Sequence, residues 1–281
     1  MERYILTLCC GDQPGIVRSL AEGIVQAKGN ILESAQFSDP PTGLFCMRTS
    51  FESPDQDLEA VRDLVAGAVS RFEPVLTLRR ESSRRRILVM VSRHDHCLAD
   101  LLYRWDIGEL PADLQLVVSN HDTCRPLAER YGLPYHHIPV TAETKPEAER
   151  RLLGLVAEHE IDVVVLARYM QVLSDGLCRS LEGRAINIHH SFLPGFKGAM
   201  PYHQAHQRGV KLIGATAHFV TPELDEGPII EQNVARVGHA HSPEQLVAIG
   251  RDVERMVLAR AVRHYAEDRV LLVGARTVVF G

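Results

Sequence analysis

Long hydrophobic runs are missing from the 281-residue sequence, and no segment approaches the roughly 18 apolar residues that a membrane-spanning helix needs. Residues 1–5 also lack the charged-then-apolar pattern of a secretory signal peptide. We therefore expect a cytoplasmic protein with no membrane partner.

Sequence motifs typical of disulfide-rich or metal-binding proteins are also absent. No two cysteines form a CxxC pair, so the sequence predicts neither a disulfide framework nor a thiolate zinc site. No HExxH motif occurs, and the close histidine pairs lack a third ligand at a recognisable spacing. We expect no metal and no cofactor. The cysteines are Cys9, Cys10, Cys46, Cys97, Cys124 and Cys178, and the histidine pairs are His94/His96, His203/His206 and His239/His241.

Positive charge is in short supply, with 31 basic against 36 acidic residues and a net charge of −5. This balance argues against a protein whose main task is to bind nucleic acid. One basic cluster stands out, and we interpret it as a solvated linker or an interface edge rather than a phosphate site. Its members are Arg79, Arg80, Arg84, Arg85 and Arg86.

What the sequence does contain is typical of a globular protein, with 45% hydrophobic and 24% charged residues. Roughly the first 80 residues predict the order strand, helix, strand, strand, helix, strand. A turn at residues 11–15 precedes the first helix, and Gly29-Asn30 ends it. The expected strands are 4–10, 31–38, 44–51 and 74–78, and the second helix is 57–72.

This βαββαβ order is that of a ferredoxin-like domain. With the loop at residues 12–15 and Asn30-Ile31 after the first helix, it resembles an ACT regulatory domain over about the first quarter of the chain. Such domains usually pair with copies of themselves and bind an amino acid at the pairing surface. The resemblance implies an effector site at Asp12, Gly15, Asn30 and Ile31, where a helix N-terminus could receive a carboxylate.

A polar stretch without periodicity at residues 81–86 marks a domain boundary, and we assign residues 1–82 to the first domain and 83–281 to the second. Buried apolar strands then alternate with helices, which predicts an α/β domain with a doubly wound, mainly parallel, Rossmann-like sheet. Ligands bind outside the carboxyl ends of the strands in such sheets. This rule points to residues 168–173 and to the loops after Ile188. The expected strands are 87–92, 114–119, 135–139 and 161–167; the expected helices are 97–105, 126–131, 147–159 and 253–265, before a closing hairpin at 270–280.

Two segments of the second domain stand out. Residues 185–198 read AINIHHSFLPGFKG, and residues 214–230 read GATAHFVTPELDEGPII. Asn187 and His189 are two apart on a short extended stretch, so their side chains face the same way. Asp225 is expected in a loop after a strand, bounded by Pro222 and by Gly227-Pro228.

The patterns Asn-x-His-x-Ser-x-Leu-Pro and Gly-x-Thr-x-His-x-Val-x-x-x-x-Asp-x-Gly-Pro-Ile-Ile are similar to those of the formyltransferase family, over about residues 87–281. Members of that family use 10-formyltetrahydrofolate. The resemblance implies that Asn187, His189 and Asp225 are the catalytic residues. We expect His190 and His218 to have supporting or structural roles. It also implies that the pteridine is held largely by backbone contacts. The implied folate-binding residues are Met170, Gln171, Leu173, Thr221, Glu223 and Leu224.

The chemistry of a formamide suits this trio, because its carbon resists attack until its oxygen can carry negative charge. Asn187 and His189 each offer an N–H to that oxygen, and one such donor is typically worth about 10²–10³ in rate. Asp225 can hold His189 protonated and accept a proton from water, a role worth about 10²–10⁴. Taken singly, the three could be a turn asparagine, a core histidine and a solvated carboxylate; their occurrence inside both motifs favours catalysis.

Members of this family differ in what receives the formyl group. A member that formylates glycinamide ribonucleotide needs a phosphate cradle, typically a Gly-rich turn after the first strand of the catalytic domain. No glycine occurs between Gly67 and Gly108, so that cradle is missing. A member acting on initiator tRNA usually carries a further basic domain, whereas this chain ends at Gly281 and is net acidic. Water is the remaining acceptor.

Three features agree with hydrolysis. Residues 95–104 (DHCLADLLYR), residues 167–170 (ARYM) and the ACT-like domain resemble the deformylase branch of the family. The resemblance implies hydrolysis of 10-formyltetrahydrofolate to formate and tetrahydrofolate, which supplies formate for purine synthesis and balances one-carbon pools. The alternative is a regulatory or binding protein that kept the fold and lost activity, and the intact trio argues against it.

The deformylase resemblance also suggests which amino acids the first domain binds. Methionine and glycine are the candidate effectors, as activator and inhibitor. The alternative is a domain that only oligomerises. Either way we expect a homo-oligomer, a tetramer or larger.

Overall fold

The computed structural model describes residues 1–54, 57–193 and 201–281. The chain forms two compact units, Met1–Arg84 together with Asp268–Gly281, and Arg85–Glu267. None of the helices among these residues combines the length and the hydropathy of a membrane-spanning segment.

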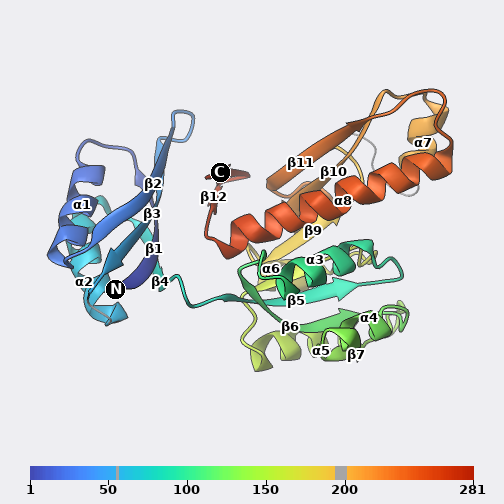
Figure 1. Ribbon diagram of the computed structural model, residues 1–281, viewed down its shortest axis with the longest axis horizontal. Coiled ribbons are helices and arrows are strands. Elements are labelled where there is room, and N and C mark those ends of the chain that lie inside the picture. Colours follow the sequence, from blue (N-terminus) through green and yellow to red (C-terminus); the bar gives the residue numbers. More distant parts are fainter. Residues whose placement is uncertain (55–56, 194–200) are drawn as a thin grey trace. The chain divides into compact units, whose positions relative to one another are not determined.

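The first unit has a four-stranded antiparallel sheet with the strand order β2-β3-β1-β4, and its described residues also form the α-helices α1 and α2 (Figure 1). This confirms the predicted ferredoxin-like βαββαβ order. The elements are β1 (Glu2–Gly11), α1 (Ile16–Gln26), β2 (Asn30–Asp39), β3 (Leu44–Ser53), α2 (Leu58–Val69), a short 3-10 helix η1 (Ser70–Phe72) and β4 (Val75–Arg80).

The core of the first unit lies between one face of this sheet and the two helices. Successive side chains of a strand point to opposite faces, so Tyr4, Leu6 and Leu8 of β1 all point to the same side. There they pack with Leu20 of α1 and Val65 of α2 in one buried cluster. The apolar alternation of β1 and the helical spacing of α1 therefore meet in a single core.

The other face of the sheet is covered by the closing hairpin of the chain, β12 (Val270–Val273) and β13 (Arg276–Val279). Val273 and Phe280 are buried against Cys46 of β3. Nη1 of Arg269 also lies 2.9 Å from Oε1 of Glu33 on β2. The predicted hairpin forms, but its contacts place residues 268–281 in the first unit rather than in the second domain, because its apolar side chains bury against this sheet.

A disulfide crosses the same sheet. Cys9 and Cys46 are directly paired on β1 and β3 and form this bond. The other four cysteines are free and buried. The expectation of no disulfide framework thus needs a correction for one cross-strand bond, which cysteine spacing could not reveal because the pairing depends on strand register.

The second unit contains a seven-stranded sheet with the order β11-β10-β9-β8-β5-β6-β7. Strands β5 to β9 are parallel, whereas β10 runs antiparallel to both β9 and β11. This confirms the predicted mainly parallel sheet. The strands are β5 (Arg85–Val91), β6 (Ala112–Ser119), β7 (Tyr135–His137), β8 (Val163–Leu166), β9 (Ala185–His189), β10 (Leu212–Phe219) and β11 (Ile229–Arg236).

Helices cover both faces of this sheet. Leu88 and Met90 of β5 pack with Leu152 of α5 and Leu177 of α6 in one core cluster. On the other side α8 contacts α3 and runs along β9, β10 and β11 (Figure 1). The helices are α3 (His96–Asp106), α4 (Arg125–Arg130), α5 (Lys145–Glu158), α6 (Asp175–Ser180), α7 (Pro201–Gln207) and α8 (Pro243–Ala266).

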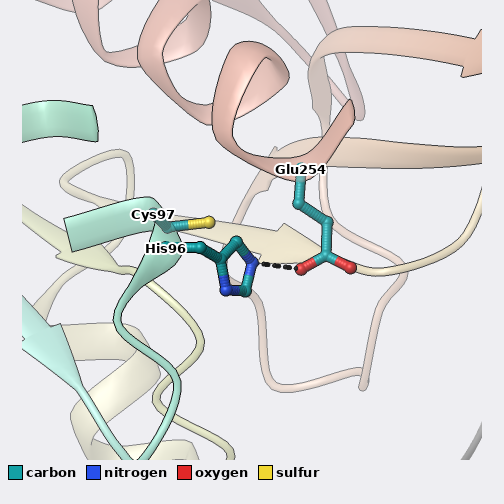
Figure 2. Close-up of side chains that lie close together, drawn as sticks. All are labelled: His96, Cys97 and Glu254. Atoms are coloured by element: carbon teal, nitrogen blue, oxygen red, sulfur yellow. Dashed lines mark hydrogen bonds and ion pairs between the residues drawn. The ribbon is translucent and has the colours of Figure 1, made fainter. Parts of the chain in front are cut away.

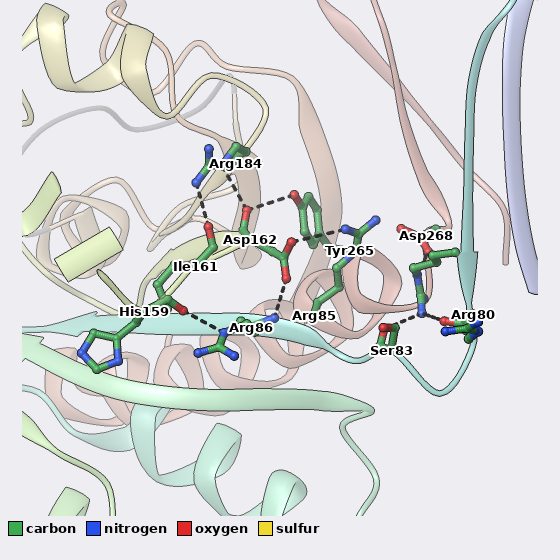
Figure 3. A network of polar contacts seen from close by, with 11 residues as sticks. Arg80, Ser83, Arg85, Arg86, His159, Ile161, Asp162, Arg184, Tyr265 and Asp268 are labelled. Atoms are coloured by element: carbon green, nitrogen blue, oxygen red, sulfur yellow. Dashed lines mark hydrogen bonds and ion pairs between the residues drawn. The ribbon is translucent and has the colours of Figure 1, made fainter. Parts of the chain in front are cut away.

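Asp162, just before β8, ties together the amino ends of three strands (Figure 3). Its carboxylate accepts the backbone N–H of Arg86 at 2.7 Å and lies 3.4 Å from Nη1 of Arg85. Nη2 of Arg184, just before β9, donates to the carbonyl oxygen of Ile161 at 2.7 Å. These contacts fix the amino ends of β5, β8 and β9. Ligands are expected at the opposite, carboxyl ends of these strands.

The basic cluster at the domain boundary makes specific contacts within each unit, so it is not simply a solvated linker. In the first unit, Nε of Arg79 pairs with Asp268, and its Nη1 donates to the carbonyl oxygen of Ser83 at 2.9 Å. In the second unit, Nε of Arg86 donates to the carbonyl oxygen of His159 at 2.8 Å. These arginines help to define the ends of the two units.

Candidate active site

The β9–β10 strand pair carries most of the predicted catalytic residues. Asn187 and His189 lie on β9, and Asn187 is directly paired with His218 of β10. Because β8 and β9 are parallel, the segment after β8 leaves the sheet at the same edge as His189. The predicted position of the site, at the carboxyl ends of these strands, agrees with this arrangement.

Asp225 is brought to this edge by the loop between β10 and β11. Its backbone has a left-handed φ of 58°. A Cβ added at Gly227 would overlap the carbonyl oxygen of Phe219, the last residue of β10. Glycine therefore lets the loop fold back closely on the strand, and the N–H of Phe219 donates to the carbonyl oxygen of Pro228 at 2.9 Å.

His189 and Asp225 form the closest charged contact of the trio. Nδ1 of His189 lies 3.2 Å from Oδ2 of Asp225, and both side chains are largely buried. The hydrogen bond from His189 holds the pKa of Asp225 below its usual range, against the opposing effect of burial. The Asp225 carboxylate is therefore ionised at neutral pH and can act as a base.

Asn187 is held by His218, a histidine expected to have a supporting or structural role. Nδ2 of Asn187 lies 3.2 Å from Nε2 of His218, and Nδ1 of His218 lies 2.8 Å from the carbonyl oxygen of Phe219. Burial lowers the pKa of His218, so its ring is neutral at pH 7. A supporting role for His218, next to the catalytic candidates, fits these contacts.

A cavity of about 550 Å³ contains all three catalytic candidates. Met170, Gln171 and Leu224 from the predicted folate set also line it. Met170 and Leu224 are 54% and 60% exposed, so they present apolar surface that a flat ring system could cover. Half of the predicted folate residues therefore share one cavity with the trio.

The remaining folate candidates lie beside this cavity. Leu173 lines a smaller hollow, which also includes Gln171. Thr221 and Glu223 belong to the turn that leads to Asp225, where the Thr221 hydroxyl donates to the Glu223 carbonyl oxygen at 3.0 Å. The end of the first motif, residues 194–198, lies outside the described residues.

A second polar cluster, which the sequence motifs do not indicate, lines the same cavity. Glu254 of α8 is 1% exposed. Its Oε2 accepts from Nε2 of His96 at 2.8 Å, and its Oε1 accepts from the Tyr202 hydroxyl at 2.6 Å. Nε of Arg168 lies 3.4 Å from Oε2. A sequence signal existed. Glu254 lies four residues after Gly250, about one helical turn along, so both residues fall on the same, buried face of α8.

The group His96, Cys97 and Glu254 offers three potential metal-ligand atoms within 4.8 Å of one another (Figure 2). Its contacts favour a hydrogen-bonded cluster instead. Both oxygens of Glu254 already accept hydrogen bonds, and the Arg168 cation would repel a metal ion. Burial also raises the pKa of the Cys97 thiol, whereas a metal is bound by the thiolate.

The predicted effector residues are not brought together within one chain. Gly11, next to Asp12, pairs with Leu44 at one end of β3, whereas Asn30 pairs with Glu52 near the other end. The reason is that α1 crosses the whole sheet between β1 and the parallel β2. Gly15, with a left-handed φ of 100°, lies beside Asp12, and Ile31 lies beside Asn30.

Comparison with known proteins agrees with this architecture. The model of the formyl transferase family matches residues 85–262. The formyltetrahydrofolate deformylase of Corynebacterium sp. (strain P-1) is 48% identical and covers 99% of this chain and 98% of its own length. The crystal structure of formyltetrahydrofolate deformylase from Burkholderia mallei ATCC 23344 is 49% identical, with a TM-score of 0.96 and complete coverage of both chains.

A transferase of similar fold matches less of the chain. Glycinamide ribonucleotide transformylase 1 from Symbiobacterium toebii is 30% identical, with a TM-score of 0.67, and covers 70% of this chain and 94% of its own. The deformylases, by contrast, match nearly the whole length, the first unit included. By sequence and by fold, the chain belongs to the family of formyltetrahydrofolate deformylases.

Proposed function

We propose that this enzyme hydrolyses 10-formyltetrahydrofolate to formate and tetrahydrofolate with Asn187, His189 and Asp225 as its catalytic residues. The observation that carries the proposal is the 3.2 Å contact between Nδ1 of His189 and Oδ2 of Asp225, in a cavity that Asn187 also lines. In the cell, the released formate supplies purine synthesis and balances one-carbon pools.

Asp225 activates the water. Its Oδ1 lies 3.8 Å from Nε2 of His218, too far for a hydrogen bond with that ring, and so can accept a proton from water. The water oxygen bonds to the formyl carbon, whose oxygen becomes negatively charged. Asn187 donates an amide N–H to this oxygen, and Nε2 of a protonated His189 donates a second.

The carbon–nitrogen bond then breaks. The folate nitrogen keeps the bonding electron pair and takes up the proton of His189, which lines the same cavity. The formyl carbon leaves as formic acid, with one oxygen from the substrate and one from water, and becomes formate when it loses its acidic proton to solvent. The proton on Asp225 also returns to solvent, and His189 takes up a proton from solvent, so both groups regain their starting state.

Formate release tests this proposal directly. The purified chain is incubated with 10-formyltetrahydrofolate without any amine, and formate and tetrahydrofolate are measured together. We expect equal amounts of both, and no increase when glycinamide ribonucleotide is added. A reaction that waits for an amine acceptor would contradict hydrolysis, and an inert chain that still binds the folate would be a binding protein.

For the first unit we propose an ACT domain that binds an amino acid, methionine or glycine, between two copies of the chain. Asp12 and Gly15 lie at one end of the sheet and Asn30 and Ile31 at the other, so a site containing all four needs a second copy. The supporting chemistry is the start of α1, whose free N–H groups suit a carboxylate.

The sensing role is tested by turnover and melting temperature with each amino acid at millimolar concentration. We expect methionine to raise turnover and glycine to lower it, and Asn30→Ala to abolish both responses while formate release without effector stays normal. If neither amino acid changes either quantity, the domain serves assembly alone. Sedimentation then tests the expected homo-oligomer, a tetramer or larger.

A further inference from the structure

The active-site cavity extends beyond the catalytic trio, and its remaining wall includes charged residues. Arg168, Arg251 and Glu254 line it together with His94 and His190. Burial lowers the pKa of both histidines, that of His190 to about 3, so both rings are neutral at pH 7. The wall also includes His96 and His203. Among its arginines and carboxylates, the two arginines outnumber the one glutamate.

Arg168 is the exceptional member of this wall. It follows β8 with a left-handed φ of 66°, and its side chain is only 10% exposed. Among the residues that the structure describes, its Nε and Nη1 have no hydrogen-bond partner. A buried N–H without a partner is costly, so these donors indicate a ligand that occupies the cavity during the reaction.

Glu254 does not satisfy Arg168. Each oxygen of Glu254 accepts a hydrogen bond from another residue, Oε2 from His96 and Oε1 from Tyr202. Its contact with Nε of Arg168, at 3.4 Å, is an ion pair without a hydrogen bond. Glu254 therefore holds the guanidinium in place and leaves N–H groups free to bind something else.

We propose that Arg168 forms a carboxylate-binding subsite in this cavity, and that its ligand is the formate ion that the reaction releases. A guanidinium is the side chain best suited to a carboxylate. Formate forms in the cavity that also contains the Asp225 carboxylate, which repels it. A cation in the same cavity offsets that repulsion and gives the anion a place to move to when the carbon–nitrogen bond has broken.

This inference rests on the proposed hydrolysis and predicts product inhibition through Arg168. Sodium formate is added to the deformylase assay, with sodium chloride keeping the ionic strength constant. We expect formate to inhibit the wild type, and its inhibition constant to rise about tenfold in Arg168→Gln and less in Arg168→Lys, which keeps the charge. A matched control is Arg255→Gln, an arginine of the same helix as Glu254 that pairs with Asp252 on the surface and should be inhibited like the wild type.

A second measurement covers a variant that folds but does not turn over. Line broadening of ¹³C-formate is titrated against wild-type protein and Arg168→Gln without any folate, after thermal melting has shown that both are folded. We expect broadening with the wild type and its loss in Arg168→Gln. This titration is independent of catalysis, so a chain that releases no formate from the folate would overturn the proposed function without affecting this test.

Two results would overturn the inference. One is that formate inhibition and ¹³C-formate line broadening are the same in the wild type and in Arg168→Gln, or that the wild type shows neither effect. The other is an Arg168→Gln variant whose inhibition by formate is unchanged but whose KM for the intact folate is raised. Its KM for a folate that lacks the glutamate would then equal that of the wild type. In that case the carboxylate that Arg168 binds belongs to the substrate's tail.

Discussion

Asn187 donates a side-chain N–H to Nε2 of His218 across 3.2 Å, which leaves one amide hydrogen for a ligand. The direction of this bond follows from the other side of the ring. Nδ1 of His218 faces the carbonyl oxygen of Phe219 at 2.8 Å, and a carbonyl only accepts, so the proton of the neutral ring lies on Nδ1. His218 is thus a positioning residue, which fixes the orientation of the Asn187 amide.

Replacing His218 should therefore reduce turnover through Asn187. We expect His218→Leu to lower kcat by about 10- to 100-fold with little change in KM, because a loosely held donor stabilises the transition state less well. His218→Gln keeps an acceptor for the Asn187 amide and should recover much of the loss. Steady-state kinetics of both variants checks this, and equal losses in the two would mean that His218 acts only by filling space.

Asp225 gives the sharpest test of the proposed base. Asp225→Asn keeps the size of the side chain but removes its charge and basicity, and we expect kcat to fall by about 10²–10⁴. The neighbouring Glu226→Gln is the matched control, since Glu226 is an exposed carboxylate in the same loop. Formate release by both variants is the measurement. Near-normal turnover of Asp225→Asn would exclude it as the base.

The fold, and the meeting of Asn187, His189 and Asp225 in one cavity, could be predicted because their signals are local. The alternation of β1, the helical spacing of α1 and the continuous apolar run of β5 each specify an element within a few residues of its observed ends. Asn187 and His189 share a face of one strand, as their spacing requires. The polar motifs therefore indicated the cavity before any distance was known.

The parts that were not predicted depend on contacts between distant residues. Periodicity placed the start of the last helix at residue 253, whereas α8 begins at Pro243 after a capping box formed by Ser242 and Gln245. The short helices α6 and α7 have too few turns to show a period. Arg168 and Glu254 are far apart in the sequence of the second unit and meet only once the chain has folded, as do Glu33 and Arg269 in the first unit.

His190 makes stability depend on pH. Burial, and then the charge of Arg168, lowers the pKa of His190 to about 3, far below the value of about 6.5 for an unfolded chain. Between these values the unfolded state binds more protons, so the free energy of unfolding decreases as the pH falls below about 6.5. We expect His190→Gln to lose less stability than the wild type between pH 7.5 and pH 5.

Urea unfolding at both pH values measures this difference. His239→Gln is the control, because the exposed side chain of His239 is in water whether the chain is folded or not, and this variant should follow the wild type. If His190→Gln loses stability as steeply as the wild type when the pH falls, other groups cause the acid sensitivity. The buried His218, whose pKa is also lowered, is the first of these to examine.

Gly227 couples the fold to the chemistry, because its lack of a side chain allows the Asp225 loop to lie against β10. A Cβ there would overlap the carbonyl oxygen of Phe219, which belongs to the backbone and cannot turn aside. Gly227→Ala must therefore move the loop, and we expect it to cost about 1–3 kcal/mol of stability. Gly154→Ala is the matched control, since none of the described residues beyond its chain neighbours and the helix's own backbone comes within 4 Å of a Cβ at that position, and alanine there should gain about 0.5–1 kcal/mol. A displacement of about 1 Å can reduce catalysis 100-fold. The rate of formate release by Gly227→Ala should therefore fall far more than the unfolded fraction, measured from its unfolding midpoint, can explain. A fully active Gly227→Ala enzyme would mean that Asp225 does not need this loop position.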